Sequence, residues 1–373
     1  MTPRLPALAV VAAVAAITGD GLVAPSAAAA EPAVAQAAPA GPPLPTADEE
    51  PAVEEVAPAA VDLTPRPVKD DKAIITLQVE NDIFTGRDQH YTNGVRLAYL
   101  SPENDVPDWL ENAARQLPLF ADEGNLRVSY ALGQNMYTPR DIEIAAPQPG
   151  DHPWAGFTYA SIGLINDAGR RLDNLELTLG IVGPSSLADQ TQEFVHKVIS
   201  TRTPRGWDNQ LHDEPIVNIA YERSWRAMWR SEYLGIEADV TPHAGGAFGN
   251  AFIHANSGVM LRLGDDLPAD FGPPRIRPSL PGSDFFVPSE QFGWYVFAGV
   301  DGRVVLRNIF LDGNTFRDSA SVDKKWVVGE LQAGIAITIN DVRIAYTHVY
   351  RTEEFDGQDE GDTFGALSVS FRF

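Results

Sequence analysis

Polar side chains suited to metal or acid–base chemistry gather in three short stretches of the sequence. The first runs from Val79 to Gly94 and contains Asn81 and Asp82, whose side-chain oxygens are hard ligands of the kind that Ca²⁺ prefers. Asn and Asp also dominate turns for purely backbone reasons, so an Asx-type turn is the competing interpretation. This stretch therefore predicts either a calcium site or a polar turn.

The second stretch, 134–141, contains Arg140 near its end. A guanidinium offers fixed paired donors, which suit a phosphate or a developing oxyanion. The alternative is a charge at a membrane rim that extends towards lipid headgroups. Both interpretations remain open for Arg140.

The third stretch is a helical segment, 185–200, with a tail that reaches Leu211. Gln192 and His196 are four residues apart and share one face of this helix. An imidazole is the usual general base for activating water, although a lone His is more often structural and the chain has 7 of them. The chain has no G-x-S-x-G elbow, H-E-x-x-H helix or P-loop, so serine-elbow hydrolases, zincins and NTPases lack their motifs here.

The helical segment is itself unusual because its spacing interrupts a long series of strands. Ser185 or Ser186 is expected to cap its start. Its apolar side is formed by Leu187, Thr191, Phe194, Val195 and Val198. A barrel wall does not need an inserted helix, so this segment is a candidate functional element.

The elements that position these stretches are strands, because the apolar period from Asp71 onward is mostly two. One example is the alternation of Leu175, Leu177, Leu179 and Ile181 with Asn174, Glu176, Thr178 and Gly180. A soluble β-sandwich gives the same alternation over shorter strands. Several runs here reach the roughly 9–11 residues that a tilted strand needs to cross a bilayer. The second face is polar or small, and aromatic residues lie near strand ends, as in a transmembrane barrel.

The candidate strands number thirteen, or twelve if 292–302 and 303–311 form one long strand. They are 73–81, 93–101, 126–136, 157–166, 172–182, 215–225, 232–242, 251–263, 292–302, 303–311, 325–340, 342–351 and 362–373. Bacterial barrels of one chain favour even strand numbers. We therefore predict an all-β fold, a 12-stranded antiparallel transmembrane β-barrel with a short helix inserted near 185–200.

The two ends of the sequence are typical of an exported outer-membrane protein. Residues 1–30 have the charged start, apolar stretch and small-residue end of a signal peptide, and 31–70 form an Ala/Pro/Glu-rich linker that is expected to be disordered. The barrel is thus predicted to span 71–373. Its last strand ends on Phe373 and resembles the terminal strand of Gram-negative outer-membrane proteins.

Composition removes several other classes of protein. The formal net charge of −23 argues against a nucleic-acid binder, and the absence of cysteine removes thiol catalysis, disulfide scaffolds and Cys-ligated zinc. No run of roughly 18 apolar residues occurs, which excludes a helical multi-span membrane protein.

Taken in order, the three stretches resemble a known family, the outer-membrane lipid A deacylases (lipid A 3′-O-deacylases). The motifs that carry the resemblance are Asn81-Asp82 followed by Tyr91-Thr92-Asn93-Gly94, then Gln134-Asn135-Met136-Tyr137-Thr138-Pro139, then Gln192-x-x-x-His196 and Gly206-Trp207-x-x-Gln210. The resemblance covers essentially all of 71–373. It implies a barrel in the Gram-negative outer membrane that removes the 3′-linked acyloxyacyl group of lipid A, the membrane anchor of lipopolysaccharide, in a calcium-dependent reaction.

The resemblance also implies roles for single residues. Asn81 and Asp82 match the Asn-Asp pair of the calcium-dependent site, and Thr92 matches the Thr of the Tyr-Thr-x-Gly turn. His196 matches the general base, and Gln192 matches the Gln one turn before it. The family has an oxyanion-stabilising Lys a few residues beyond the Tyr-x-Pro motif. This chain reads Ile-Glu-Ile at 142–144 instead, and Arg140 is the nearest cation.

These parts combine into a mechanistic hypothesis. Ca²⁺ held near Asn81 and Asp82 polarises the ester carbonyl, and His196 takes a proton from the water that attacks it. The cation, together with Arg140, stabilises the oxyanion. Two alternatives remain, namely a phospholipase-type esterase with a Ser nucleophile beside the His, and a non-catalytic porin or structural barrel in which the helix is a plug.

Overall fold

The computed structural model describes residues 70–82, 90–118, 120, 124–200, 202–265, 267–276, 284–288 and 290–373. The chain divides into two units, Met1–Pro58 and Ala59–Phe373, and all of these residues belong to the second. The predicted signal peptide, 1–30, lies outside the described residues. Of the predicted linker, 31–70, only Asp70 is described.

The second unit consists mainly of β-strands with a few short helices. The strands are β1 Ile74–Asn81, β2 His90–Leu100, β3 Asn125–Thr138, β4 Ala155–Asp167, β5 Arg171–Val182, β6 Glu214–Trp225, β7 Trp229–Tyr233, β8 Ile236–Gly249, β9 Phe252–Asp265, β10 Phe292–Asn308, β11 Val327–Ile339, β12 Val342–Arg351 and β13 Asp362–Arg372. The helices are η2 Glu103–Asp105, α2 Asp108–Ala114, η3 Pro184–Ser186, α3 Ala188–Ile199, η4 Trp207–Asn209 and α4 Ile309–Asp312. Among the described residues, no helix is both long enough and apolar enough to cross a bilayer.

Twelve of these strands form one closed antiparallel barrel, which confirms the predicted fold. Neighbours in the sequence pair with one another except β6 and β7, β1 pairs with β13, and β6 pairs with β8 to close the ring. The strand outside the ring is β7, which pairs only with β8. The two runs 292–302 and 303–311 belong to one strand, β10, up to Asn308. The predicted run 232–242 differs from the structure, because a hairpin turn with positive φ at Leu234 and Gly235 separates β7 from β8. Such a turn suits the twist of an antiparallel pair.

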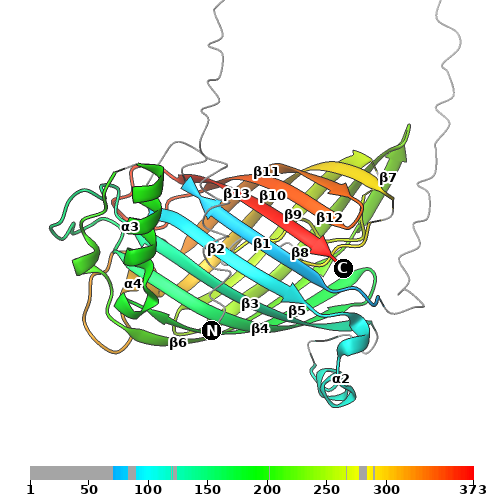
Figure 1. Cartoon of the computed structure of the whole chain (residues 1–373), viewed down its shortest axis with the longest axis horizontal. Coiled ribbons are helices and arrows are strands. Elements are labelled where there is room, and N and C mark those ends of the chain that lie inside the picture. The colour runs from blue at the N-terminus through cyan, green and yellow to red at the C-terminus, as the bar shows by residue number, and fades with distance from the viewer. Residues whose placement is uncertain are drawn as a thin grey trace, which may run out of the picture. The chain divides into compact units, whose positions relative to one another are not determined.

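The polarity of the barrel is inverted relative to a soluble protein, as in barrels that span a membrane. Apolar side chains that alternate along the strands are exposed on the outer wall, including Leu97, Leu132, Leu179, Ile219, Val300 and Leu331. The alternate positions point into the lumen and bury polar groups, including Thr76, Glu80, Asp301, Glu330 and Arg343. Figure 1 shows the strands inclined around the barrel, with α3 at one end and the C-terminus at the other.

The lumen of the barrel is filled by part of the connection between β9 and β10. We call its described residues the lumen segment, 267–276 and 284–288. Arg275 of this segment donates to Glu80 on β1 (Nε–Oε1 2.7 Å), and Asp284 accepts from Arg96 on β2 (Nη1–Oδ2 3.0 Å). Ion pairs between a lumen insert and the wall, with side chains that are mostly buried, argue against an open pore.

The strongest attachment of the lumen segment is at Asp270, which is fully buried. Its carboxylate accepts hydrogen bonds from Arg343 (2.8 Å), from the Tyr295 hydroxyl (2.9 Å) and from Arg262. Removing one partner of a buried ion pair leaves the other charge without compensation in a low-dielectric interior.

We expect Asp270→Ala to lower the free energy of unfolding by about 3–5 kcal/mol, because Arg343 loses a buried carboxylate partner and Arg262 keeps only its pair with Asp239. Denaturant unfolding of the protein in lipid vesicles measures this change. The matched control is Asp359→Ala, since the Asp359 side chain is 75% exposed and its pairing should contribute less than about 1 kcal/mol. Equal stability of the two variants would contradict the assigned role of Asp270.

Candidate active site

The predicted site residues lie at one end of the barrel, where β1 ends, β2 begins, β3 ends and β4 begins. Toward this rim the outer wall becomes covered. On β1 the exposed fraction falls from 40% at Ile75 to 5% at Val79, and on β3 it falls from 64% at Leu132 to 2% at Met136. All four side chains alternate onto the outer face, so something packs on the outside of the wall here.

The covering element on β3 and β4 is α3 with the turn that precedes it. Gln134 and Thr158 both donate to the carbonyl of Ser186, at 2.8 and 2.7 Å. The contact is close enough to require glycine at 156, because a Cβ there would lie 2.2 Å from Ser186 Oγ and 2.3 Å from the Cβ of Ala188. Figure 1 shows α3 running across the strands rather than along them. The helix therefore covers the outer wall and is not a plug in the lumen. We call the region between α3 and the wall the roofed site.

The buried side of α3 is its polar side. Ala188, Gln192 and His196 are spaced four residues apart and are 1%, 2% and 5% exposed. The expected helix is thus confirmed, with bounds Ala188–Ile199 inside the predicted 185–200. Its predicted cap is wrong, because the N-cap residue is Leu187, in a left-handed conformation, and makes no side-chain cap.

Ser185 and Ser186 instead belong to η3 and hydrogen-bond elsewhere. The Ser186 hydroxyl donates to the Gly183 carbonyl (2.6 Å), and the Ser185 hydroxyl donates to Asp213 (2.7 Å). Both hydroxyls fix the chain reversal between β5 and α3. They are engaged in turn structure rather than directed at His196.

The hydrogen bond of His196 selects the tautomer that a general base needs. Its Nδ1 lies 2.6 Å from the backbone carbonyl oxygen of Arg202. A carbonyl only accepts, so Nδ1 carries the proton and Nε2 of the neutral ring keeps its lone pair. In many other sites a carboxylate fixes the orientation of the histidine ring. Here a backbone carbonyl fixes it.

Gln192 is held by an indole that sequence reasoning did not assign a role. The Nε1–H of Trp207 donates to Gln192 Oε1 at 2.7 Å, and both side chains are buried. Trp207 in turn contacts Trp154 with ring centroids 5.0 Å apart. The only sequence signal for this contact was the motif Gly-Trp-x-x-Gln at 206–210, shortly after the helix.

We expect Trp207→Phe to lower kcat/KM by about tenfold, because the buried Gln192 oxygen loses its donor at a cost of roughly 1–3 kcal/mol. The matched control is Trp154→Phe, which removes an equally buried N–H with no hydrogen-bond partner among the described residues. Steady-state hydrolysis by the two variants, with unfolding temperatures as a check on folding, measures the difference. Equal losses in both variants would mean that packing alone matters.

Thr92 occupies an irregular position at the start of β2. The register between β2 and β3 shifts between Tyr91 and Asn93, so Thr92 is the extra residue of a β-bulge, a feature that often re-aims a side chain next to a site. Its hydroxyl lies 2.7 Å from the hydroxyl of Thr138 at the end of β3, and both residues are buried.

Asn81 is the last residue of β1 and pairs in register with Asn93 of β2, and Asp82 follows it with 2% exposure. In the described part of the chain no three His, Cys, Asp or Glu side chains form a metal cluster. The candidate donors at this end of the wall are one carboxylate, one amide oxygen and one hydroxyl oxygen, from Asp82, Asn81 and Thr92. Calcium accepts such a mixed oxygen set, completed by backbone carbonyls and water, so the residues fit this ion.

Arg140 follows β3 and points towards the loop between β12 and β13. Its Nη1 donates to Asp359 at 2.7 Å, its side chain is 47% exposed, and this partner raises the pKa of the guanidinium. Its backbone N–H donates to Asp151. The structure thus shows Arg140 in an ion pair at the rim, and its predicted contact with an oxyanion stays a prediction.

Two other histidines have acidic neighbours that the sequence did not reveal. The Nδ1 of His90 lies 2.6 Å from Asp362, and the Nε2 of His243 lies 2.9 Å from Asp301. The Nε2 of His90 also lies 3.4 Å from Asp151. Burial raises the pKa of Asp151, but the nearby His90 ring and hydrogen bonds from the backbone N–H groups of Arg140 and His152 outweigh this effect and lower the pKa to about 2. Both histidines are 2% exposed and paired with carboxylates, which fits structural pairs better than a site open to lipid.

With this geometry described, comparison with known proteins gives a clear match. A family model described as outer membrane protein LpxR matches residues 22–373. The chain belongs to the LpxR family. It is therefore an outer-membrane protein, as its barrel also indicates.

A solved structure of LpxR supports the fold of this LpxR-family barrel. LpxR from Salmonella typhimurium is similar with a TM-score of 0.66 and 20% identity, over 80% of this chain and 99% of that chain. The β domain of the Bordetella autotransporter BrkA gives 0.37 and 9% identity over 82% of this chain and 98% of that one. The translocator domain of the autotransporter NalP from Neisseria meningitidis has a TM-score of 0.33 and 10% identity, over 81% of this chain and 88% of that chain. No curated protein sequence matches significantly.

Proposed function

We propose that this protein is an outer-membrane lipid A deacylase, a carboxylic ester hydrolase that removes the 3′-linked acyloxyacyl group of lipid A by water attack. Membership of the LpxR family supports the substrate class. The observation that carries the chemistry is a buried His196 whose Nδ1–H is bound by a carbonyl, on the helix face turned to the wall.

In the proposed reaction, His196 Nε2 accepts a proton from water, which then attacks the ester carbonyl. The carbonyl of Arg202 holds the ring in place and stabilises the imidazolium that forms. When the tetrahedral intermediate collapses, the same nitrogen returns the proton to the leaving oxygen. A single group thus serves as base and then as acid.

The surrounding residues orient the reactants. Gln192, fixed by Trp207, presents its amide next to His196 on the same helix face. Asn81, Asp82 and Thr92 would hold a calcium ion, which when bound supplies positive charge for the developing oxyanion. Arg140 contributes to that charge only if its guanidinium leaves Asp359, and kcat of Arg140→Gln reports on this contribution.

Access from the lipid phase is supported by the outer side of α3. Leu187, Phe194 and Val198 are exposed on the side away from the wall, at 57%, 48% and 50%. An apolar helix face on the outside of a barrel is suited to the acyl region of a leaflet. A substrate that is itself a membrane lipid would then reach the site sideways, without leaving the bilayer.

The alternatives receive less support. A Ser nucleophile would need a hydroxyl at His196, whereas Ser185 and Ser186 bind Asp213 and Gly183. A porin would need a wet lumen, whereas Arg275 and Asp284 of the lumen segment pair with the wall.

Purified protein, supplied with Ca²⁺ and either lipid A or phosphatidylethanolamine, tests the proposal. We expect free acyl chains from lipid A alone, with no inhibition by serine-directed reagents. Hydrolysis of phosphatidylethanolamine that such reagents block would favour the phospholipase-type alternative. Intact lipids in both incubations would favour a structural barrel.

A further inference from the structure

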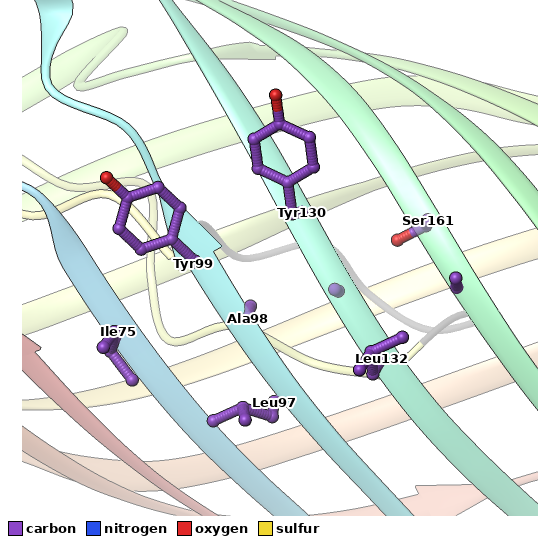
Figure 2. A pocket seen from close by; sticks show the side chains of 9 residues that line it. Ile75, Leu97, Ala98, Tyr99, Tyr130, Leu132 and Ser161 are labelled. Atoms are coloured by element: carbon purple, nitrogen blue, oxygen red, sulfur yellow. The ribbon is translucent and has the colours of Figure 1, made fainter. Parts of the chain in front are cut away.

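An apolar groove lies on the outer wall of the barrel, across β1 to β4. It has a volume of about 320 Å³ and is lined by Ile75, Leu97, Ala98, Tyr99, Tyr130, Ala131, Leu132, Ala160 and Ser161. Figure 2 shows the rings of Tyr99 and Tyr130 on one side, Leu97 and Leu132 on the other, and Ala98 between them. The groove thus has bulky walls and a floor of small residues.

The walls of the groove are two cross-strand pairs. Leu97 lies opposite Leu132, and Tyr99 lies opposite Tyr130, whose ring is stacked on it with centroids 6.5 Å apart. Side chains directly opposite one another in a β-sheet contact each other, so each pair forms one continuous ridge. The methyl-sized side chain of Ala160 on β4 leaves the groove open at its side.

The groove begins where the cover of α3 ends. Leu132 is two residues from Gln134 and Ala160 is two residues from Thr158, and Gln134 and Thr158 are the residues that bind the Ser186 carbonyl before α3. Two strand residues span roughly 7 Å, and alternate residues share one face. The groove therefore continues the roofed site along the wall, into the depth of the leaflet.

We propose that this groove binds an acyl chain of the lipid A whose ester lies under α3. The inference rests on the proposed function. The occupant must be apolar and flexible, since the groove faces the hydrocarbon region and its lining is nearly all aliphatic or aromatic. Continuity with the site under α3 selects the substrate's own chain over an unrelated lipid. The groove then positions the ester and measures chain length.

The test uses photoreactive lipids bound to the His196→Ala protein, which leaves the probe intact. One probe is lipid A with a diazirine in its acyl chains, and the other is phosphatidylethanolamine with the same diazirine chain. We expect the lipid A probe to label peptides of β2, β3 and β4 several-fold more than the phospholipid probe does.

The variant Ala160→Leu narrows the groove, and the matched control Ala298→Leu adds the same side chain to an exposed outer-wall position on β10. Excluding about two methylene groups from an apolar site weakens binding about tenfold, so Ala160→Leu should reduce groove labelling by that factor and Ala298→Leu should not. Equal labelling by both probes, or labelling unchanged in Ala160→Leu, would overturn the inference. Because cross-linking needs no turnover, groove labelling without hydrolysis by the wild type would count only against the proposed function.

Discussion

The His196→Ala variant should lose hydrolysis of lipid A by about 10²–10⁴-fold in kcat, the usual contribution of a positioned general base. The reason is that water attack then lacks the Nε2 lone pair that the Arg202 carbonyl keeps available. Quantifying the acyl chains released by purified protein measures this loss. KM should change little, because the imidazole acts on water rather than on the lipid.

His212→Ala is the matched control, since this histidine is exposed in the loop that leads to β6 and its described hydrogen bonds, both with Asn314, are made by its backbone. It should retain wild-type activity. If His196→Ala keeps more than about a tenth of wild-type kcat, general-base catalysis by this residue is ruled out.

The Asp82→Asn variant should need at least about 100-fold more Ca²⁺ for activity, because the change removes the one carboxylate of the proposed oxygen set. A second readout does not depend on turnover. Calcium bound only to the folded wild type stabilises it by about 2.7 kcal/mol at 100 times its dissociation constant, so Ca²⁺ should raise the unfolding temperature.

Asp82→Asn should abolish that calcium-dependent rise, whereas Glu143→Gln, an exposed acidic position in the loop after β3, should preserve it. Full activity of the wild type in the presence of a chelator would contradict calcium dependence altogether. If Ca²⁺ raised the unfolding temperature of Asp82→Asn as much as that of the wild type, the ion would be bound by other residues.

The barrel was predictable from the sequence because the alternation that marks its strands involves only residues close together in the chain. Strands such as β5 alternate apolar and polar residues, and the period of two is set by the geometry of the backbone. The segment that fills the lumen was not predictable in the same way. Residues 267–276 have no period, and the contact between Arg275 and Glu80 joins positions 195 apart in the sequence.

The site was predictable in its parts and less so in its arrangement. The four-residue spacing of Gln192 and His196 placed them on one helix face, and the structure confirms this face as the buried one. The donor from Trp207 and the acceptor from Arg202 come from the return loop, whose path depends on tertiary packing. The ion pair of Arg140 with Asp359 likewise joins residues 219 apart.

The orientation of α3 shows why membrane context decides such assignments. In a soluble protein the apolar side of Phe194 and Val198 would face the core. On the outer wall of a barrel the solvent is lipid, so this side is exposed and the polar side is buried. Helical periodicity alone gives the two faces but not which of them turns inward.

The central claim is that His196, in the roofed site outside the barrel, hydrolyses an ester of lipid A. The most direct measurement is mass spectrometry of lipid A from cells that express either the wild-type protein or His196→Ala, with Ca²⁺ present. The account predicts lipid A lighter by the 3′-linked acyloxyacyl group in wild-type cells and unmodified lipid A in the variant. Lipid A of the same mass in both, with the two barrels equally abundant in the outer membrane, would contradict it.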